Sequence, residues 1–214
     1  MAGILAMMQQ ASYPLSYELT DSADDSSDAT TYTFTGKDIN TGGLVIVGII
    51  GRHFSVGTRT VSSVTIGGSA ATLNVASGAG FMNAGIASLF VSATTATIAV
   101  TFSGAMEGCS IVVWVLNNYG SATPFHTGAA TPAVSPLSTN LNLPPKGVAF
   151  VVFGHFNTND TTLTNATESL DTDLATPTAS YGAGEYRATA AETSRAIGTS
   201  WTDNSGVQAM ASWS

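Results

Sequence analysis

The sequence predicts an all-β protein, built as a two-layer antiparallel β-sandwich of jelly-roll or Greek-key type. Two observations support this prediction. Apolar residues come in short runs that alternate with polar residues or are rich in Val, Ile and Thr, and clusters of Gly, Ser and Asn separate the runs. About ten such strands fit a single sandwich domain over 30–214, preceded by an N-terminal arm and acidic loop over 1–29.

Charge is scarce, because Asp, Glu, Lys and Arg make up 9% of the 214 residues, against about 25% in ordinary domains. The polar surface must therefore consist mainly of Ser, Thr, Asn and Gly. Charge is also depleted at the cores of interfaces, which favours a homo-oligomer over a monomer with a Ser/Thr surface. The net charge is −8 and the basic residues are scattered, which argues against binding to nucleic acid or to an anionic membrane.

The chain holds one cysteine, so it can form no intramolecular disulfide. The N-terminal segment "MAGILAMMQQASY" is apolar but has no basic residue before its hydrophobic part, unlike a signal peptide. No apolar run reaches the roughly 18 residues that a membrane helix requires. The sequence thus predicts a soluble chain without a recognisable export signal.

The first twenty residues are poorly patterned and carry an apolar patch around Met7 and Met8. The segment 21–29, "DSADDSSDA", has four aspartates and no large apolar residue, so a solvated loop is expected there. Strand patterning begins at Thr30, where Tyr32 and Phe34 alternate with threonines.

Further strands follow in order along the chain. Gly67-Gly68 predicts a tight hairpin between the segments "TVSSVTI" and "AATLNVAS". Two strands over 84–93 and 95–104 meet near Thr94 and Thr95. After a loop come strands over 137–144 and 147–156, and the Ala-rich 185–197 region favours strands over a helix because of its threonines.

Three apolar runs begin with glycine, at 43–50, 108–116 and 147–156. Within 109–116 both alternating sets of side chains are apolar, which predicts a strand covered on both faces. All three runs are therefore expected to be central strands. Their spacing is irregular, so no repeat array is predicted.

The sequence predicts no enzyme, and no catalytic, cofactor-binding or metal-binding residues are assigned. Cys109 lies in an apolar run beside Glu107, which favours a core thiol over a nucleophile. Each histidine is next to a phenylalanine, and the spacing of His53, His126 and His155 fits no metal site. There is no G-x-S-x-G elbow, P-loop or G-x-G-x-x-G motif.

Two segments invite a test for calcium. Starting at Asp21, the acidic segment lacks the glycine and glutamate of an EF-hand loop. A different calcium site using Asp24, Asp25 or Asp28 is an alternative to the solvated loop. Asn157, Asn159 and Asp160 offer ligands for calcium or sugar hydroxyls, although turn chemistry is the simpler reading. Sequons at Asn159 and Asn165 are read as chance matches.

The order of several segments resembles a known group of proteins. A "VSSVTIGG" hairpin is followed by a strand ending in "VTFSG", then by "CSIVVWVL", "SATPFHT" and "LPPKGVAFVVF". This order, over roughly residues 40 to 156, is similar to small β-sandwich structural proteins of tailed bacteriophages and gene-transfer agents. The resemblance implies a virion component such as a head spike, a decoration or a fibre-associated protein, and it carries over no catalytic residues.

The leading expectation is therefore a structural component on the surface of a phage-like virion, either a capsid decoration or a head-spike or fibre base. It would assemble as a homo-oligomer and dock onto other virion proteins, with its apolar arm as the anchor. The alternative is a carbohydrate-binding, receptor-binding module of a tail fibre, in which Tyr119, Phe125, Tyr181 or Trp201 grip a glycan.

Overall fold

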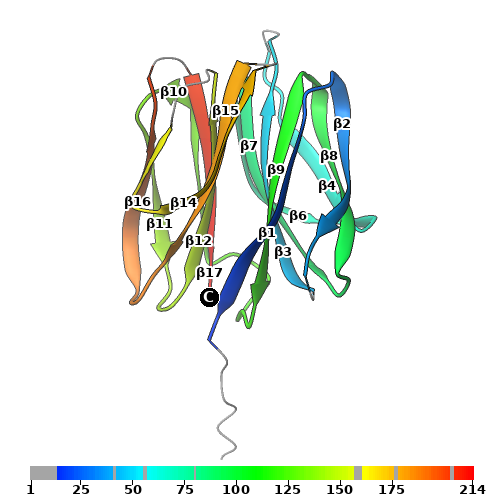
Figure 1. Ribbon diagram of the computed structural model, residues 1–214. Coiled ribbons are helices and arrows are strands. Elements are labelled where there is room, and N and C mark those ends of the chain that lie inside the picture. The colour runs from blue at the N-terminus through cyan, green and yellow to red at the C-terminus, as the bar shows by residue number, and fades with distance from the viewer. Residues whose placement is uncertain are drawn as a thin grey trace, which may run out of the picture.

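A computed structural model describes residues 14–40, 42–54, 57–79, 81–156, 161–175, 178–202 and 205–214, with the backbone alone at 79, 131–134, 171–175, 178 and 205. The chain is all-β, as predicted, and its antiparallel sheets pack face to face (Figure 1). The strands of the first half are β1 (Ser16–Asp25), β2 (Ala29–Asp38), β3 (Gly43–Arg52), β4 (Val61–Ile66), β5 (Ser69–Ala70), β6 (Thr72–Ala79), β7 (Met82–Val91), β8 (Thr95–Met106) and β9 (Gly108–Asn117). Those of the second half are β10 (His126–Val134), β11 (Leu137–Leu143), β12 (Val148–His155), β13 (Thr162–Thr164), β14 (Thr167–Ala175), β15 (Thr178–Arg187), β16 (Glu192–Ser200) and β17 (Ser205–Trp213).

The strands form four sheets. Sheet A has the order β1-β9-β3-β7-β6 and sheet B the order β2-β8-β4-β5. Sheet C has the order β10-β17-β12-β15-β14 and sheet D the order β11-β16-β13. One apolar core lies between A and B, one between C and D, and a third joins A to C. The layers therefore stack as D, C, A, B, from left to right in Figure 1. The predicted sandwich is present, and the chain builds it twice.

The two halves repeat one strand order. Strand for strand, β1-β9-β3-β7-β6 corresponds to β10-β17-β12-β15-β14, and β2-β8-β4 corresponds to β11-β16-β13. The expectation of no repeat was wrong. The sequence hides the repeat because β9 is a continuous apolar run, whereas its counterpart β17, "SGVQAMASW", is interrupted by Gln208 and small residues.

Several element predictions are confirmed. Every residue of β3 and β12 is buried, as are nine of the ten residues of β9, because these strands lie inside sheets covered on both faces. The turn at Gly67 and Gly68 is present, with positive φ angles of 60° and 80° between β4 and β5, as a type I′ turn requires. The strand predicted to follow it was wrong, because across this turn β4 pairs with only the two-residue β5, and most of "AATLNVAS" is β6, which pairs with β7 in sheet A. The 185–197 region belongs to strands β15 and β16.

The solvated loop predicted over 21–29 was wrong for its first half. Residues 21–25 belong to β1, which pairs with β9 as the edge strand of sheet A. An edge strand tolerates carboxylates because half of its surface faces water. Asp21 accepts a hydrogen bond from the Asp38 backbone and lies 3.2 Å from the Lys37 ammonium.

The described residues include no helix that is long and apolar enough to cross a membrane.

Candidate functional site

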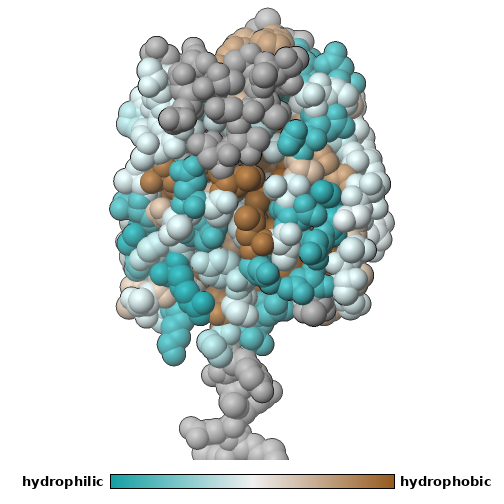
Figure 2. All heavy atoms as spheres, viewed as in Figure 1, coloured by the Kyte–Doolittle hydropathy of each residue, from teal (hydrophilic) through white to brown (hydrophobic). Residues whose placement is uncertain are grey.

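The two sandwiches meet along two seams, and the seams differ. At the rear, β10 packs against β6, and the Ser77 hydroxyl donates a hydrogen bond to the Ala130 carbonyl. The counterparts of these strands at the front, β1 and β14, pack against each other far less closely over their described residues. We call this gap the open seam. Figure 2 shows apolar atoms exposed along it, between polar surfaces on either side.

A hollow lies in the open seam, with a volume of about 200 Å³ when the open space before it is included. Its lining comes from both sandwiches: Gly48, Ile50, Ser110, Ile111, Val112, Val152, Leu170, Tyr181, Gly182 and Ala183. Small-molecule sites in proteins usually measure about 300–1,000 Å³. Most of the 200 Å³ is open space, and the enclosed part has room for about one water molecule, so the hollow is a shallow, mostly apolar depression and not a cofactor site.

Glycine creates the close approach beneath the hollow. A Cβ atom at Gly48 would lie 2.2 Å from Cγ1 of Val152 and 2.6 Å from Cγ1 of Val112. Only a residue without a side chain lets β3 approach β12 this closely. The same contact joins the two sandwiches directly below the seam.

Arg52, at the end of β3, is the most unusual residue near the hollow. It is fully buried, and its guanidinium carbon lies 4.0 Å from the ring centroid of Phe54 and 4.2 Å from that of Phe156. The two rings meet edge to face at 5.4 Å. None of its three side-chain nitrogens has a hydrogen-bond partner among the described residues, although a buried cation normally requires one.

Two other polar groups near Arg52 also lack partners among the described residues. The Tyr181 hydroxyl is buried in the lining of the hollow, and Oε2 of Glu107 is buried as well. Oε1 of Glu107 accepts a hydrogen bond from the Phe54 backbone at 3.1 Å. Burial lowers the pKa of Arg52, and the nearby Tyr181 and Glu107 oppose this shift. Burial also raises the pKa of Tyr181.

This cluster of Arg52, Glu107 and Tyr181 presents unused donors and acceptors together. A ligand with hydroxyl groups could satisfy both kinds, whereas a simple anion would be repelled by Glu107. The sequence analysis missed the cluster. The available signal was the similar ending of two buried runs, "GRHF" at 51–54 and "GHF" at 154–156, which brings Phe54 and Phe156 together across the seam.

Cys109 is a core thiol, as predicted. It is fully buried between sheets A and B, and burial raises the pKa of the thiol well above its ordinary value. A thiol held in its neutral form is a poor nucleophile.

The histidines occupy separate places. His53 packs against Phe81, with ring centroids 6.2 Å apart. His155 stacks on Trp201 at 5.2 Å, and its Nε2 lies 2.8 Å from the Thr161 hydroxyl. His126 pairs with Ser212, at the opposite end of sheet C from His155. The structure therefore does not bring the three together.

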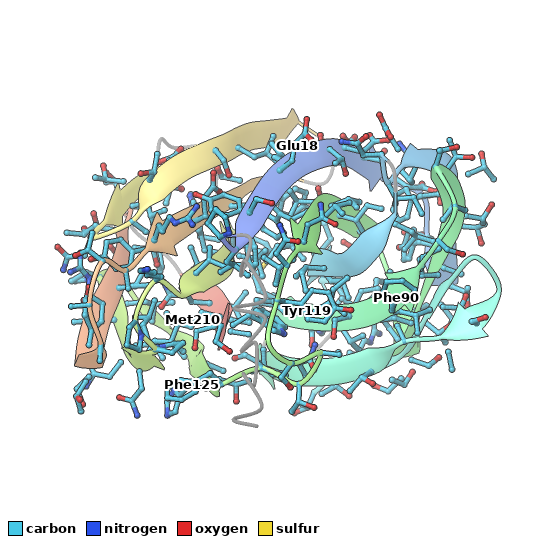
Figure 3. All side chains as sticks on the ribbon, turned by 90° about the horizontal axis from the view of Figure 1, so that it is seen from below. Glu18, Phe90, Tyr119, Phe125 and Met210 are labelled. Carbon is cyan, nitrogen blue, oxygen red and sulfur yellow. The ribbon has the colours of Figure 1, made fainter. Side chains whose placement is uncertain are left out.

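The aromatic residues suggested for sugar binding are also dispersed. Tyr119 and Phe125 lie at the lower end of the molecule, which Figure 3 views from below. Tyr181 and Trp201 are buried, and Tyr181 lies near the upper end of the seam beside Arg52. These four residues share no surface.

The calcium candidates gain no support from the geometry. Asp24 and Asp25 lie on β1, and no group of three or more His, Cys, Asp or Glu side chains is placed to hold a metal ion among the residues that the structure describes. Asn157, Asn159 and Asp160 lie outside the described residues. The Asn165 side chain donates a hydrogen bond to the Ala196 carbonyl.

Glu185, on β15, provides a test of the seam's electrostatics. Burial raises the pKa of its carboxyl group, with partial opposition from Ser169 and Trp114. The folded state therefore retains this proton to a higher pH than the unfolded state. The contribution of Glu185 to the free energy of unfolding is fully present below the pKa of the unfolded carboxyl, about 4.3. This contribution is lost as the pH rises through the folded pKa.

Replacing Glu185 with glutamine should remove this pH-dependent loss of stability. At pH values above the folded pKa of Glu185, the variant should be more stable than the wild type. Urea unfolding of both proteins at several pH values between 4 and 8 measures the effect. Parallel pH profiles for the wild type and E185Q would contradict the assignment.

No protein-family model matches the chain, and no curated protein is similar to it.

Proposed function

We propose that the chain is a structural component on the surface of a phage-like virion and acts by homo-oligomeric assembly and docking to other virion proteins. The observation that supports this most is the open seam, an apolar strip between β1 and β14, which are the last strands of their sheets in the part of the chain that the structure describes. Exposed edges and contiguous apolar surface mark sites of protein association. Jelly-roll sandwiches, a class of all-β fold, occur in viral capsid domains and in lectin domains.

The root of the N-terminal segment adds support, because it is fixed at the lower end of the same seam. Leu15 is buried in the core that joins the two sandwiches. The Arg187 guanidinium donates to the Leu15 carbonyl, and the Asn118 amide donates to the Pro14 carbonyl at 3.2 Å. If the N-terminal segment binds a virion protein, these contacts would hold the two sandwiches to it.

Density-gradient separation of assembled particles tests the proposal, with mass spectrometry of each fraction. The chain should co-sediment with intact particles in a fixed ratio to the major shell protein. Recovery only as free protein at the top of the gradient would contradict a virion role.

Deleting residues 1–10 should abolish attachment to particles and leave the sandwiches folded. The reason is that the buried core begins at Leu15, beyond the deletion. Circular dichroism and a thermal melt of the variant provide the control for folding. Unchanged co-sedimentation of the shortened chain would show that the arm is not the anchor.

A second candidate is a carbohydrate-binding module, and the Arg52 cluster is the observation that favours it. Charged and hydroxyl groups beside aromatic rings provide both hydrogen bonds and a stacking surface for a sugar, and Phe54 is 52% exposed. A glycan array, probed with and without calcium, separates this function from assembly alone. Binding that survives replacement of Arg52 would place the sugar elsewhere.

A further inference from the structure

We propose that the open seam is the docking surface for a basic partner, an extended segment of another virion protein in which apolar residues alternate with lysine or arginine. This inference rests on the proposed function, because it names the chemistry of the partner that docks. Three features of the molecule support it: the charges of the strands that border the two seams, a buried hydroxyl group in the open seam, and the apolar strip along it.

The rear seam serves as an internal reference, because the two strands that border it carry no charge. Neither β6, "TLNVASGA", nor β10, "HTGAATPAV", contains Asp, Glu, Lys or Arg. These strands pack against each other, and the Ser77 hydroxyl donates a hydrogen bond to the Ala130 carbonyl between them. Uncharged edge strands can therefore close the junction between sheets A and C.

The strands that border the open seam are strongly acidic. β1, "SYELTDSADD", contains four acidic residues and β14, "TESLDTDLA", contains three, which together are half of the 14 in the chain. Neither strand contains Lys or Arg. Because like charges that face each other repel, closing this seam as the rear one is closed carries an electrostatic cost. A partner that brings positive charge removes that cost.

The carboxylates of β1 are largely without a cation. Glu18 and Asp24 are exposed. In the described part of the chain, the only carboxylate of β1 in an ion pair is Asp21, which lies 3.2 Å from the Lys37 ammonium. Glu18 accepts a hydrogen bond at 2.7 Å from the Asn40 amide, which carries no charge. Lysine or arginine side chains of a partner would therefore meet carboxylates that are not yet neutralised.

A buried hydroxyl group in the seam also lacks a partner. Tyr181 is 1% exposed and lines the hollow, and its hydroxyl has no hydrogen-bond partner among the described residues. Asp24 of β1 lies at the same level, because it pairs with Ser110, which also lines the hollow. A polypeptide laid along the seam brings backbone carbonyl groups, which can accept the hydrogen of such a hydroxyl.

The strip between the two acidic strands is apolar (Figure 2). Ile, Val, Leu and Ala make up most of the lining of the hollow, and Tyr17 and Leu19 of β1 pack against the same core. Alternate side chains of an extended segment point in opposite directions. Its apolar side chains can therefore face the strip, while long basic side chains reach the carboxylates at the rim. Addition of an extended segment beside an edge strand is a common mode of peptide recognition.

Two other occupants fit this surface less well. In a two-fold dimer the same surface patch of each copy meets the other, so a second copy would place the acidic strands of two seams opposite each other. The six basic residues of the chain are scattered and form no complementary patch in the sequence. A metal ion is also disfavoured, because the described residues include no group of three or more His, Cys, Asp or Glu placed to hold one.

Peptide binding to the complete chain tests the inference. The probe is a fluorescent peptide of alternating Lys and Val, about eight residues long like a typical strand. Fluorescence anisotropy should detect binding at about 50 mM salt, and the affinity should fall at least about tenfold at about 500 mM salt, where charges are screened. A peptide of alternating Lys and Ser has the same charge but no apolar side chains, and it should bind at least about fivefold more weakly.

The variant E18Q/D24N removes two exposed carboxylates from β1 and should weaken binding of the Lys-Val peptide at least about fivefold. The matched control is T33K/T97K, which changes the net charge by the same amount at exposed positions of sheet B. Its affinity should change less than about twofold, because these positions lie beyond the screening length from the seam. Thermal melts establish that both variants are folded.

Three results would overturn the proposal. The first is equal weakening in the two variants, which would mean that the peptide responds only to net charge. The second is equal affinity for the Lys-Val and Lys-Ser peptides, which would exclude a contribution from the apolar strip. The third is no binding of either peptide, which would mean that the carboxylates only protect the edge strands from aggregation.

Co-sedimentation with particles separates failure of this inference from failure of the proposed function. E18Q/D24N should lose attachment, whereas T33K/T97K should retain it. Attachment of E18Q/D24N at the level of the wild type would place docking elsewhere on the molecule and leave the virion role standing. If the wild type itself does not attach, the virion role fails, and the peptide titration still decides whether the seam binds a basic segment.

Discussion

Replacing Trp114 with alanine is expected to lower the free energy of unfolding by about 3–5 kcal/mol, the usual cost of removing a large buried aromatic side chain. Trp114 lies on β9, is fully buried, and belongs to the core that joins sheets A and C. Its ring centroid lies 5.0 Å from that of Phe150 on β12. The substitution therefore opens a cavity between the two sandwiches rather than within one.

Urea unfolding followed by tryptophan fluorescence and far-UV circular dichroism measures this loss. Phe90→Ala is the matched control, because Phe90 is 61% exposed on β7 and its loss should change stability by less than about 0.5 kcal/mol. If the two variants lose similar stability, the packing between sheets A and C contributes little to folding.

Replacing Arg52 with methionine is expected to leave stability unchanged or to raise it by about 1–4 kcal/mol, as found when buried charges give way to apolar residues of similar size. The guanidinium is fully buried without a hydrogen-bond partner among the described residues. Its contact with the rings of Phe54 and Phe156 contributes about 2 kcal/mol or more because the guanidinium is desolvated, and this loss offsets part of the gain. Methionine can occupy the same space between the rings.

The control for R52M is R195M. Arg195 also stacks on an aromatic ring, Tyr186, at 3.8 Å, but it has a carboxylate partner in Glu192 at 3.0 Å. Because this pair is partly exposed, its removal should cost up to about 1 kcal/mol. A large loss of stability in R52M, beyond that of R195M, would mean that the guanidinium has an acceptor in solution.

The sequence was sufficient to predict the central strands, because burial on both faces makes β3, β9 and β12 continuously apolar. It was also sufficient for the Gly67-Gly68 turn, because few residues adopt two successive positive φ angles, but not for the partner of β4, because "AATLNVAS" mostly crosses to sheet A as β6. Pairing between strands was harder to predict. The consecutive strands β7 and β8 belong to different sheets, and no local pattern encodes that separation.

The candidate site could not be predicted for a related reason. The hollow combines Gly48 and Ser110 with Val152 and Tyr181, which come from two halves of the chain and meet only when sheet A packs on sheet C. Little in the local sequence indicates that Arg52 is buried, because a single arginine at a strand end is usually exposed. Its burial depends on Phe156, about a hundred residues further along the chain.

Both ends of the described chain are hydrogen-bonded to the loop between β9 and β10, which places them close together. Asn118 binds the Pro14 carbonyl, and the Gly120 amide donates to the Ser214 carbonyl. A tag or reporter fused after Ser214 would therefore emerge beside Pro14, at the lower end of the open seam. Cargo for display belongs at the opposite end, about one strand length of 33 Å away, near the exposed Phe54 ring.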